Sequence, residues 1–366
     1  ASGVSRLNYP LIDGVVNGCP SHLLEPQRAN LLQYSEDFSQ WTNSNTSDLS
    51  NQIISPNGTL NADKLITDNG SINGQITKTL SKSASAITYN YSVFAKKGEW
   101  NRCNLYVSDS GSFANRVQFF VDLENGDVIQ ATTAGAFSSA SGSSENYGNG
   151  WYRFSVTFTT STETAITARI YSIDSVATTG DGTSGVYIWG AQIEQGSYAT
   201  SYIPTNGSAV TRSAETANGA GDASTFNDSE GVLYLETSAL SNDLSERRFS
   251  LSDGTSSNVV RVGYTSVSNR IIAVVYNGSN QTVMTYTSPD ITQNSKIAVK
   301  YKANDFALWV DGVERNADAN GSVFTANTLN SLSFNVGGAS HFYSETKDVR
   351  VYNIALTDAE LQALTT

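Results

Sequence analysis

The sequence predicts an all-β fold with two tandem antiparallel β-sandwich domains, and three observations support this prediction. Short runs that alternate apolar and polar residues recur at steady spacing, separated by turns rich in glycine and asparagine. A helical period occurs only near the C-terminus. The chain has 366 residues, which is too long for one sandwich. Two domains of roughly 150–180 residues each fit this length.

The first 205 residues are predicted to form a lead-in and one sandwich. Residues 1–29 contain three prolines and no helical period, so they are expected to form an extended lead-in. The first domain is predicted over residues 30–205. Within it, Asn125-Gly126 lies between two alternating runs and predicts a hairpin turn. Residues 187–205 are predicted to begin as an alternating strand that closes the domain and to end as a polar, extended exit. The other strands predicted in this domain are 87–95, 101–107, 116–123, 151–158 and 165–172.

Residues 206–228 are rich in Asn, Gly, Ala and Ser without an apolar period, and they are predicted to be a linker. The second domain is predicted over residues 229–366. Asp311-Gly312 predicts a second hairpin. Thr357 followed by Glu360 forms a capping-box pattern, which predicts a short C-terminal helix. The strands predicted in this domain are 231–237, 247–251, 258–264, 270–276, 282–286, 296–301, 305–310 and 332–336.

The composition excludes several classes of function. The net charge of −12 argues against nucleic acid, because phosphate binding needs clustered Lys and Arg. No apolar run of about 20 residues occurs, so membrane insertion is not expected. Charged residues make up 15% of the chain, which is typical of β-rich extracellular or virion proteins with a neutral polar surface. Cys19 and Cys103 are more simply interpreted as a loop thiol and a core thiol than as a disulfide.

Strand alternation predicts a core face and a polar face in the first domain. A sugar needs a flat aromatic ring for its C–H face, together with amides and guanidinium groups for its hydroxyls. The polar face supplies these groups, although polar faces of sandwiches are more often simply solvated. The predicted core face is Tyr89, Tyr91, Val93, Leu105, Val107, Val117, Phe119, Val121, Ile166 and Ile170. The candidate carbohydrate-binding residues are Asn104, Tyr106, Arg116, Gln118, Arg169 and Tyr171.

Two further sets of residues have open interpretations. Trp100 precedes a strand, where its ring could be an exposed platform for a sugar or a lid over the core. In the second domain Arg247, Arg261 and Arg270 alternate with apolar residues. They could line a groove for an acidic glycan or face a neighbouring subunit.

Sequence motifs extend the prediction to known families. Residues 30–205 resemble the jelly-roll carbohydrate-binding modules, and residues 229–364 resemble the laminin-G and concanavalin-like lectin sandwich. Residues 18–28 resemble the segment that precedes such modules in bacteriophage tail and fibre proteins. In the first domain the resemblance rests on the segments 30–38, 62–65, 91–96, 150–154 and 187–194. In the second it rests on 306–312, 335–338 and 349–361.

The resemblance implies a non-catalytic glycan-binding protein, the receptor-binding part of a phage tail or surface fibre that recognises cell-surface polysaccharide. It implies a location on the virion surface or outside the cell, and a homo-oligomer with a trimer favoured. Catalysis is not expected, because no carboxylate pair with glycosidase spacing, nucleophile elbow or phosphate loop occurs. Two alternatives stay open: an accessory region of a secreted polysaccharide-degrading enzyme, and a purely structural fibre or decoration protein.

The resemblance also implies one structural calcium ion in the first domain. Calcium takes six to eight oxygen ligands. The residues that the resemblance places on the ligand-supplying elements are Glu36, Asp63, Gln192 and Glu194. The alternative interpretation is that these groups are solvated.

Overall fold

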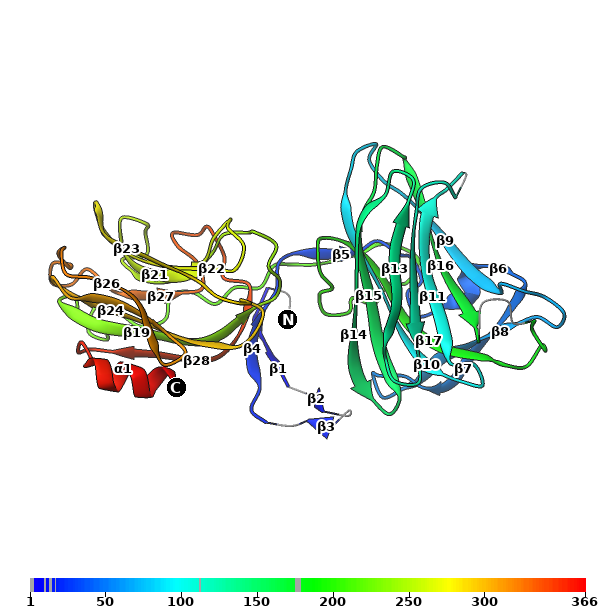
Figure 1. The fold of residues 1–366 in the computed structure, drawn as a ribbon, viewed down its shortest axis with the longest axis horizontal. Helices are drawn as coiled ribbons and strands as arrows, with labels where there is room; N and C mark the ends of the chain where they lie inside the picture. The colour runs from blue at the N-terminus through cyan, green and yellow to red at the C-terminus, as the bar shows by residue number, and fades with distance from the viewer. Residues whose placement is uncertain (1–2, 10, 13–14, 17, 112, 175–178) are drawn as a thin grey trace. The chain divides into compact units, whose positions relative to one another are not determined.

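The computed structural model describes residues 3–9, 11–12, 15–16, 18–111, 113–174 and 179–366 (Figure 1). Within these residues the chain is almost entirely antiparallel β-sheet with one short C-terminal helix, which confirms the predicted fold class. The chain divides into two compact units. We call them the central unit, residues 11–17 and 27–212, and the terminal unit, residues 1–10, 18–26 and 213–366.

The central unit is a sandwich of two six-stranded sheets, ordered β14-β15-β10-β17-β8-β7 and β13-β12-β11-β16-β9-β6. Every predicted strand of this domain overlaps an observed one, and the sequence patterns missed β6 to β9, β13 and β14. The strands are β6 Thr42–Ser44, β7 Thr46–Ile54, β8 Leu60–Thr67, β9 Gln75–Ser81, β10 Thr88–Lys97, β11 Arg102–Asp109, β12 Arg116–Asp122, β13 Val128–Ala134, β14 Ser138–Gly148, β15 Trp151–Thr159, β16 Ala165–Ile173 and β17 Gly185–Gln195. Smaller elements are the pair β2 Leu11–Ile12 and β3 Val15–Val16, the pair β5 Arg28–Asn30 and β18 Val210–Arg212, and the 3-10 helix η1 Phe38–Gln40.

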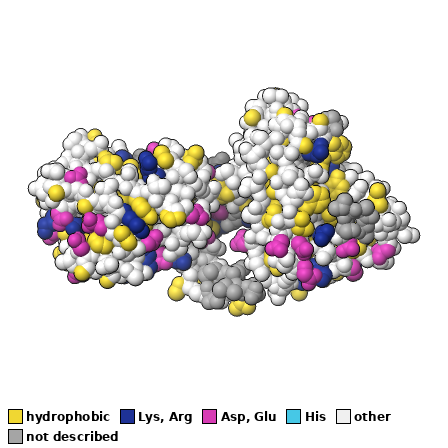
Figure 2. Space-filling view, in the orientation of Figure 1, with side chains coloured by type: hydrophobic (Ala, Val, Ile, Leu, Met, Phe, Trp, Pro, Cys, Tyr) yellow, Lys and Arg dark blue, Asp and Glu magenta, His cyan; other side chains and the backbone are white. Residues whose placement is uncertain are grey.

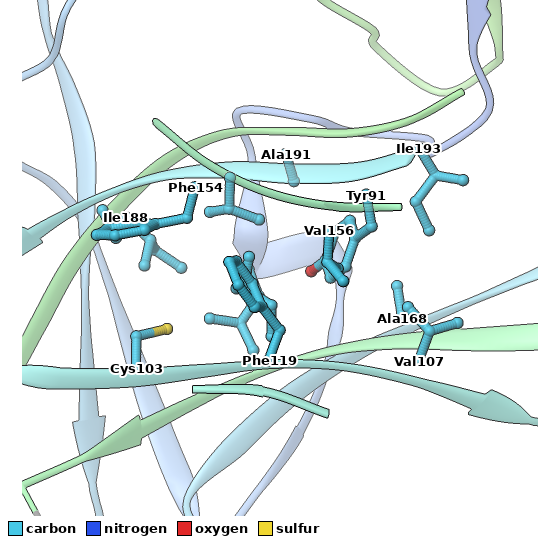
Figure 3. Packing of buried hydrophobic residues seen from close by; sticks show 14 of the residues in the cluster. Tyr91, Cys103, Val107, Phe119, Phe154, Val156, Ala168, Ile188, Ala191 and Ile193 are labelled. Atoms are coloured by element: carbon cyan, nitrogen blue, oxygen red, sulfur yellow. The ribbon is translucent and has the colours of Figure 1, made fainter. Parts of the chain in front are cut away.

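The core of the central unit lies between its two sheets. Figure 3 shows side chains of β10, β15 and β17 facing those of β11, β12 and β16, with Phe119 and Phe154 among them. All ten residues of the predicted core face belong to this cluster, because a strand buries every second side chain. Cys103 lies in the same core and Cys19 is exposed, both as free thiols.

The terminal unit is a second sandwich, with a seven-stranded sheet β1-β4-β28-β19-β24-β25-β26 and a five-stranded sheet β23-β22-β21-β20-β27. Each strand predicted in this domain overlaps an observed one. The strands are β1 Arg6–Asn8, β4 Ser21–Leu24, β19 Glu230–Ala239, β20 Arg247–Ser252, β21 Asn258–Tyr264, β22 Arg270–Asn277, β23 Asn280–Thr287, β24 Ser295–Lys302, β25 Phe306–Val310, β26 Val313–Asp318, β27 Ser331–Ser333 and β28 Ser344–Tyr352.

The predicted lead-in, residues 1–29, is not a separate extended segment. Its strand β4 pairs with β28 in the register Leu23 to Glu345, and β1 pairs with β4. Leu23 and Leu24 are buried there, and burial of their apolar side chains stabilises the pairing. The predicted linker is also bound to its surroundings, since Val210 pairs with Asn30 and Ala220 bridges to β27. The residues before 27 therefore belong mostly to the terminal unit, residues 27–212 build the central unit, and the chain then returns to the terminal unit.

Local signals in the terminal unit are confirmed. Asp311 and Gly312 both have positive φ and join β25 to β26 in a two-residue turn. The helix α1 (Asp358–Thr365) begins after Thr357, whose side chain accepts from the Glu360 N–H while the Glu360 carboxylate accepts from the Thr357 N–H. Asn125-Gly126 lies in the connection between β12 and β13, which form a hairpin with a loop longer than two residues.

Candidate glycan-binding face

Three neighbouring strands bring the predicted carbohydrate-binding residues onto one face. In the register of β11 with its neighbours, Tyr106 lies opposite Gln118 on β12 and Arg169 on β16. Two residues before Tyr106 on β11, Asn104 lies opposite Tyr171 on β16. Their strand neighbours fill the core, so these side chains point to the opposite face of the sheet. We call this surface the β11 face.

An arginine and three aromatic rings form the centre of the β11 face. Tyr106 and Tyr171 meet edge to face with ring centroids 5.9 Å apart. The Arg169 guanidinium lies 5.5 Å from the Tyr106 ring centroid and 4.3 Å from that of Phe113, in the loop between β11 and β12. Arg169 Nη1 donates to Ser108 Oγ at 2.8 Å, which fixes the guanidinium in place.

The β11 face has a buried floor and an accessible rim. Asn104 and Arg169 are each 6% exposed and Tyr106 is 7% exposed, so they form the floor. Tyr171, Arg116 and Gln118 are half-buried, and Phe113 is exposed. A ligand on this face would therefore contact the rim residues and the few exposed atoms of the floor residues.

The charge state of the face favours hydrogen bonding to hydroxyls. Burial raises the pKa of Tyr106 and of Tyr171, although the neighbouring guanidinium groups of Arg116 and Arg169 lower that of Tyr106. Both tyrosines are therefore neutral near pH 7 and can donate through their O–H. Arg116 Nη1 donates to the carbonyl oxygen of Phe113 at 3.1 Å, which ties the exposed ring to β12.

Sequence patterns missed part of this face. Gln75 on β9 lies opposite Tyr171, and Thr77 lies opposite Arg169. Gln75 Oε1 is shielded from solvent and has no hydrogen-bond partner among the described residues, and the same holds for Arg102 Nε on β11. The alternation of Ile76 with polar neighbours was the available signal for β9.

Trp100 does not belong to this face, which corrects its assignment as a sugar platform. Its ring lies in the core cluster and is 6% exposed. The backbone N–H of Trp100 donates to the Gly185 carbonyl at 3.1 Å, which holds the segment before β11 against the start of β17. The lid over the core was the better of the two interpretations.

Two of the four predicted calcium ligands, Gln192 and Glu194, have side-chain oxygens that already accept hydrogen bonds within the protein. Glu194 accepts from Gln192 Nε2 and from the N–H and Oγ1 of Thr200, at 2.6–2.7 Å. Gln192 Oε1 accepts from the Ile203 N–H at 2.7 Å. Because protein donors already occupy these oxygens, Gln192 and Glu194 do not fit a calcium site.

Asp63 does fit an oxygen-rich site, together with residues that the sequence did not single out. Asp63 is 2% exposed, and its Oδ2 has no hydrogen-bond partner among the described residues. Both carboxylate oxygens of Asp48 and Oδ1 of Asn61 are also shielded from solvent without a hydrogen-bond partner among the described residues. Asn61 Nδ2 donates to Glu36 at 3.1 Å, so Glu36 lies beside this group. Among the described residues no three His, Cys, Asp or Glu are grouped to hold a metal, so backbone or amide oxygens would have to complete the shell.

One protein-family model matches a part of the chain. Residues 237–362 match a family model described as the concanavalin A-like lectin/glucanases superfamily. No curated protein sequence gives a significant match.

Similar solved structures have low identity to this chain. The CBM40 of the Ruminococcus gnavus IT-sialidase, bound to α2,3-sialyllactose, is 16% identical, with 41% of this chain and 94% of that chain covered and a TM-score of 0.35. Domains LG4-5 of the mouse laminin α1 chain are 11% identical, with 79% and 91% covered and a TM-score of 0.28. The Trypanosoma rangeli sialidase in complex with sialic acid is 10% identical, with 83% and 60% covered and a TM-score of 0.29.

Proposed function

We propose that this protein binds glycans without chemical conversion and that the ligand lies on the β11 face. The observation that carries the proposal is the convergence of Tyr106, Tyr171 and Arg169 on one face of the sheet. Two amides lie directly opposite the tyrosines in the strand register, Gln118 opposite Tyr106 and Asn104 opposite Tyr171. Aromatic rings pack against the C–H face of a sugar, and planar amides and guanidinium groups hydrogen-bond vicinal hydroxyls. The match of residues 237–362 to a lectin and glucanase family supports a carbohydrate ligand for the chain.

The surface charge agrees with a ligand that is recognised by hydrogen bonds and stacking. On the face that Figure 2 shows, charged side chains appear in small groups among backbone and uncharged side chains. No helix in the described ranges is long and apolar enough to cross a membrane. The proposed partner is a polysaccharide or glycan on a cell surface.

The first test is a glycan array followed by titration of the best ligand against variants. Tyr171→Ala is expected to weaken binding about five- to tenfold, because a lost ring contact costs roughly 1 kcal/mol or more. Tyr171 is half-buried on the polar side of the sheet, so truncation leaves the core intact. Arg116→Ala is expected to cost more if the ligand is anionic, since a charge-assisted pair is then lost.

The matched control is Tyr9→Ala, which removes a tyrosine 47% exposed and outside the β11 face. It should bind like the unchanged protein. Equal affinity of the Tyr171, Arg116 and Tyr9 variants for the ligand would place the binding site elsewhere. The absence of any ligand across a broad array would favour the structural fibre or decoration protein instead.

The proposed biological setting is the receptor-binding part of a phage tail or surface fibre, with a trimer as the favoured assembly. It rests on the resemblance of residues 18–28 to fibre proteins. The alternative is an accessory region of a secreted polysaccharide-degrading enzyme. Release of reducing ends or unsaturated uronate from a polysaccharide panel would contradict the non-catalytic function, and a monomer in light scattering would remove support for the fibre.

We also propose that calcium binds at Asp48, Asp63 and Asn61 in a structural role. A ligand that binds only the folded state stabilises it by mass action. Adding a chelator is therefore expected to lower the melting temperature of the central unit, and Asp63→Asn should abolish this response. Glu194→Gln should keep it, because Glu194 is engaged by protein donors. No chelator response and no bound metal by elemental analysis would contradict the site.

A further inference from the structure

The outer face of the five-stranded sheet in the terminal unit carries three arginines. Arg248, Arg261 and Arg270 lie on the adjacent strands β20, β21 and β22. Each has an immediate strand neighbour in the core, such as Phe249 or Ile271. Because side chains alternate along a strand, the arginines point away from the core.

The strand register places these arginines around one glycine. Gly263 lies opposite Arg248 on one side and Ile272 on the other. Arg261 precedes Gly263 by two residues on β21, and Arg270 precedes Ile272 by two residues on β22. Arg248 and Arg261 are diagonal neighbours across β20 and β21, and Arg270 is a diagonal neighbour of Gly263 across β22 and β21. Such pairs lie roughly 7–8 Å apart in a sheet. Arginine side chains from these positions are long enough to reach over the glycine.

Gly263 has no side chain, and the strand pairing allows none. A Cβ atom at this position would lie 1.9 Å from the carbonyl oxygen of Arg247. The glycine therefore allows the close approach of β20 and β21.

Arg248 is 6% exposed, and its Nη1 donates to the carbonyl oxygens of Arg247 and Tyr264. The positive charge of the group has few acidic partners among the described residues. Among the carboxylates of the described chain only Glu246 lies within ion-pair distance, at 3.5 Å from Arg248, and its side chain is 56% exposed. Nε of Arg261 and Nε of Arg270 are shielded from solvent without a hydrogen-bond partner in the described ranges. Burial lowers the pKa of Arg248, and the charge of Arg261 lowers it further. Like charges gather here in a chain whose net charge is −12.

Arg247, the neighbour of Arg248 on β20, has a structural role and hydrogen-bond partners nearby. Its guanidinium donates to the Asp243 carboxylate at 2.7 Å and to the Ser241 carbonyl at 2.8 Å. It is 3% exposed. The protein thus pairs this buried arginine with an acid from a neighbouring loop, and supplies no such partner to Arg261 or Arg270 on the opposite side of the sheet.

We propose that Arg261 and Arg270 form a second binding site, which takes the carboxylate or sulfate groups of an acidic polysaccharide. The buried Arg248 adds positive charge beside them. The planar guanidinium matches both anions with paired N–H donors. Thr285 lies opposite Ile272, and Thr287 lies opposite Arg270. Both threonines are exposed and offer hydroxyls beside the arginines, which suits a polyhydroxylated ligand. This site goes beyond the function proposed for the β11 face and is independent of it.

The test measures binding of the whole chain to heparin, polygalacturonate, neutral dextran and double-stranded DNA. Heparin carries sulfate and polygalacturonate carries carboxylate, so the two distinguish the sources of negative charge. In the double variant Arg261→Gln, Arg270→Gln we expect at least a tenfold loss of affinity for the acidic polysaccharide that binds, and a smaller dependence on salt. Its melting temperature should match that of the unchanged protein.

One variant serves as the matched control and a second one distinguishes the two sites. Arg350→Gln removes one positive charge from β28 in the other sheet of the same unit, where Arg350 is exposed and pairs with Asp348, and it should retain binding of the acidic polysaccharide. Arg116→Gln removes one from the β11 face and reports whether the acidic ligand lies there instead.

Three results would overturn the second site. An equal loss per charge in the Arg350 variant would show that only net charge matters. A loss confined to Arg116→Gln would place the acidic ligand on the β11 face. DNA binding of equal strength with the same dependence on Arg261 and Arg270, or no binding of either acidic polysaccharide, would exclude a site that selects acidic glycans. Loss of neutral glycan binding in Tyr171→Ala tests the β11 face separately.

Discussion

Replacing Arg6 with alanine is expected to lower the free energy of unfolding of the terminal unit by about 3–5 kcal/mol. Arg6 on β1 donates through Nε to Glu215 and through Nη2 to Glu25. The side chains of these glutamates are only 3% and 6% exposed. Without the guanidinium, two nearby buried carboxylates would lose the positive charge that Arg6 supplies, and this is the main source of the loss.

The measurement is calorimetric or denaturant unfolding, followed through the transition of the terminal unit. Arg350→Ala is the matched control, because it removes an exposed ion pair from the same sheet and should cost less than about 1 kcal/mol. Adding Glu25→Gln and Glu215→Gln to the Arg6 variant should restore part of the stability, since the buried charges are then gone. If Arg6→Ala and Arg350→Ala unfold alike, the buried carboxylates do not depend on Arg6.

Strand period and turn chemistry were sufficient to predict most of the fold. The two faces of β10, β11, β12 and β16 follow from alternation alone, because burial on one side demands a period of two. The Asp311-Gly312 turn and the capped helix are set by neighbours within a few residues. Such features need no knowledge of distant partners.

The pairing of residues 21–24 could not be predicted in this way. The partner of Leu23 is Glu345, more than three hundred residues later, and a strand pattern says nothing about which edge it joins. The same limit applies to Arg6, whose acidic partners lie on other segments.

The candidate site shows a similar division. Alternation placed Asn104, Tyr106 and Gln118 on one face, and the register then made them neighbours of Arg169 and Tyr171. Trp100 is buried, and its backbone is hydrogen-bonded to the start of β17, a contact between distant segments that alternation does not report. Asp48 went unnoticed because an isolated carboxylate in a polar strand is ordinarily solvated, and only tertiary packing shields its oxygens.

A change in pH is expected to reveal the two shielded carboxylates in metal-free protein. Burial raises the pKa of Asp48 to about 7, and repulsion by Asp63 adds to this. Burial likewise raises the pKa of Asp63 to about 6, against hydrogen bonds from Asn51 and Phe38 that lower it. Between the ordinary aspartate range near pH 4 and these values, the folded protein holds protons that the unfolded chain has released. The free energy of unfolding should therefore fall as the pH rises through this window.

We expect the loss attributable to this pair to be on the order of 1–2 kcal/mol, after allowance for solvent screening. The measurement is urea unfolding of the central unit from pH 4.5 to 8 with a chelator present. The variant Asp48→Asn, Asp63→Asn should lack this part of the slope and be more stable than the unchanged protein near pH 8, because neutral amides replace two buried charges. Asp127→Asn, at an exposed loop position, is the control and should keep the slope. If the double variant and the unchanged protein lose stability equally with rising pH, the two carboxylates are solvated and their pKa values are not raised.

Calcium added near pH 8 should stabilise the unchanged protein and leave the double variant unaffected, since an amide pair offers the ion no negative charge.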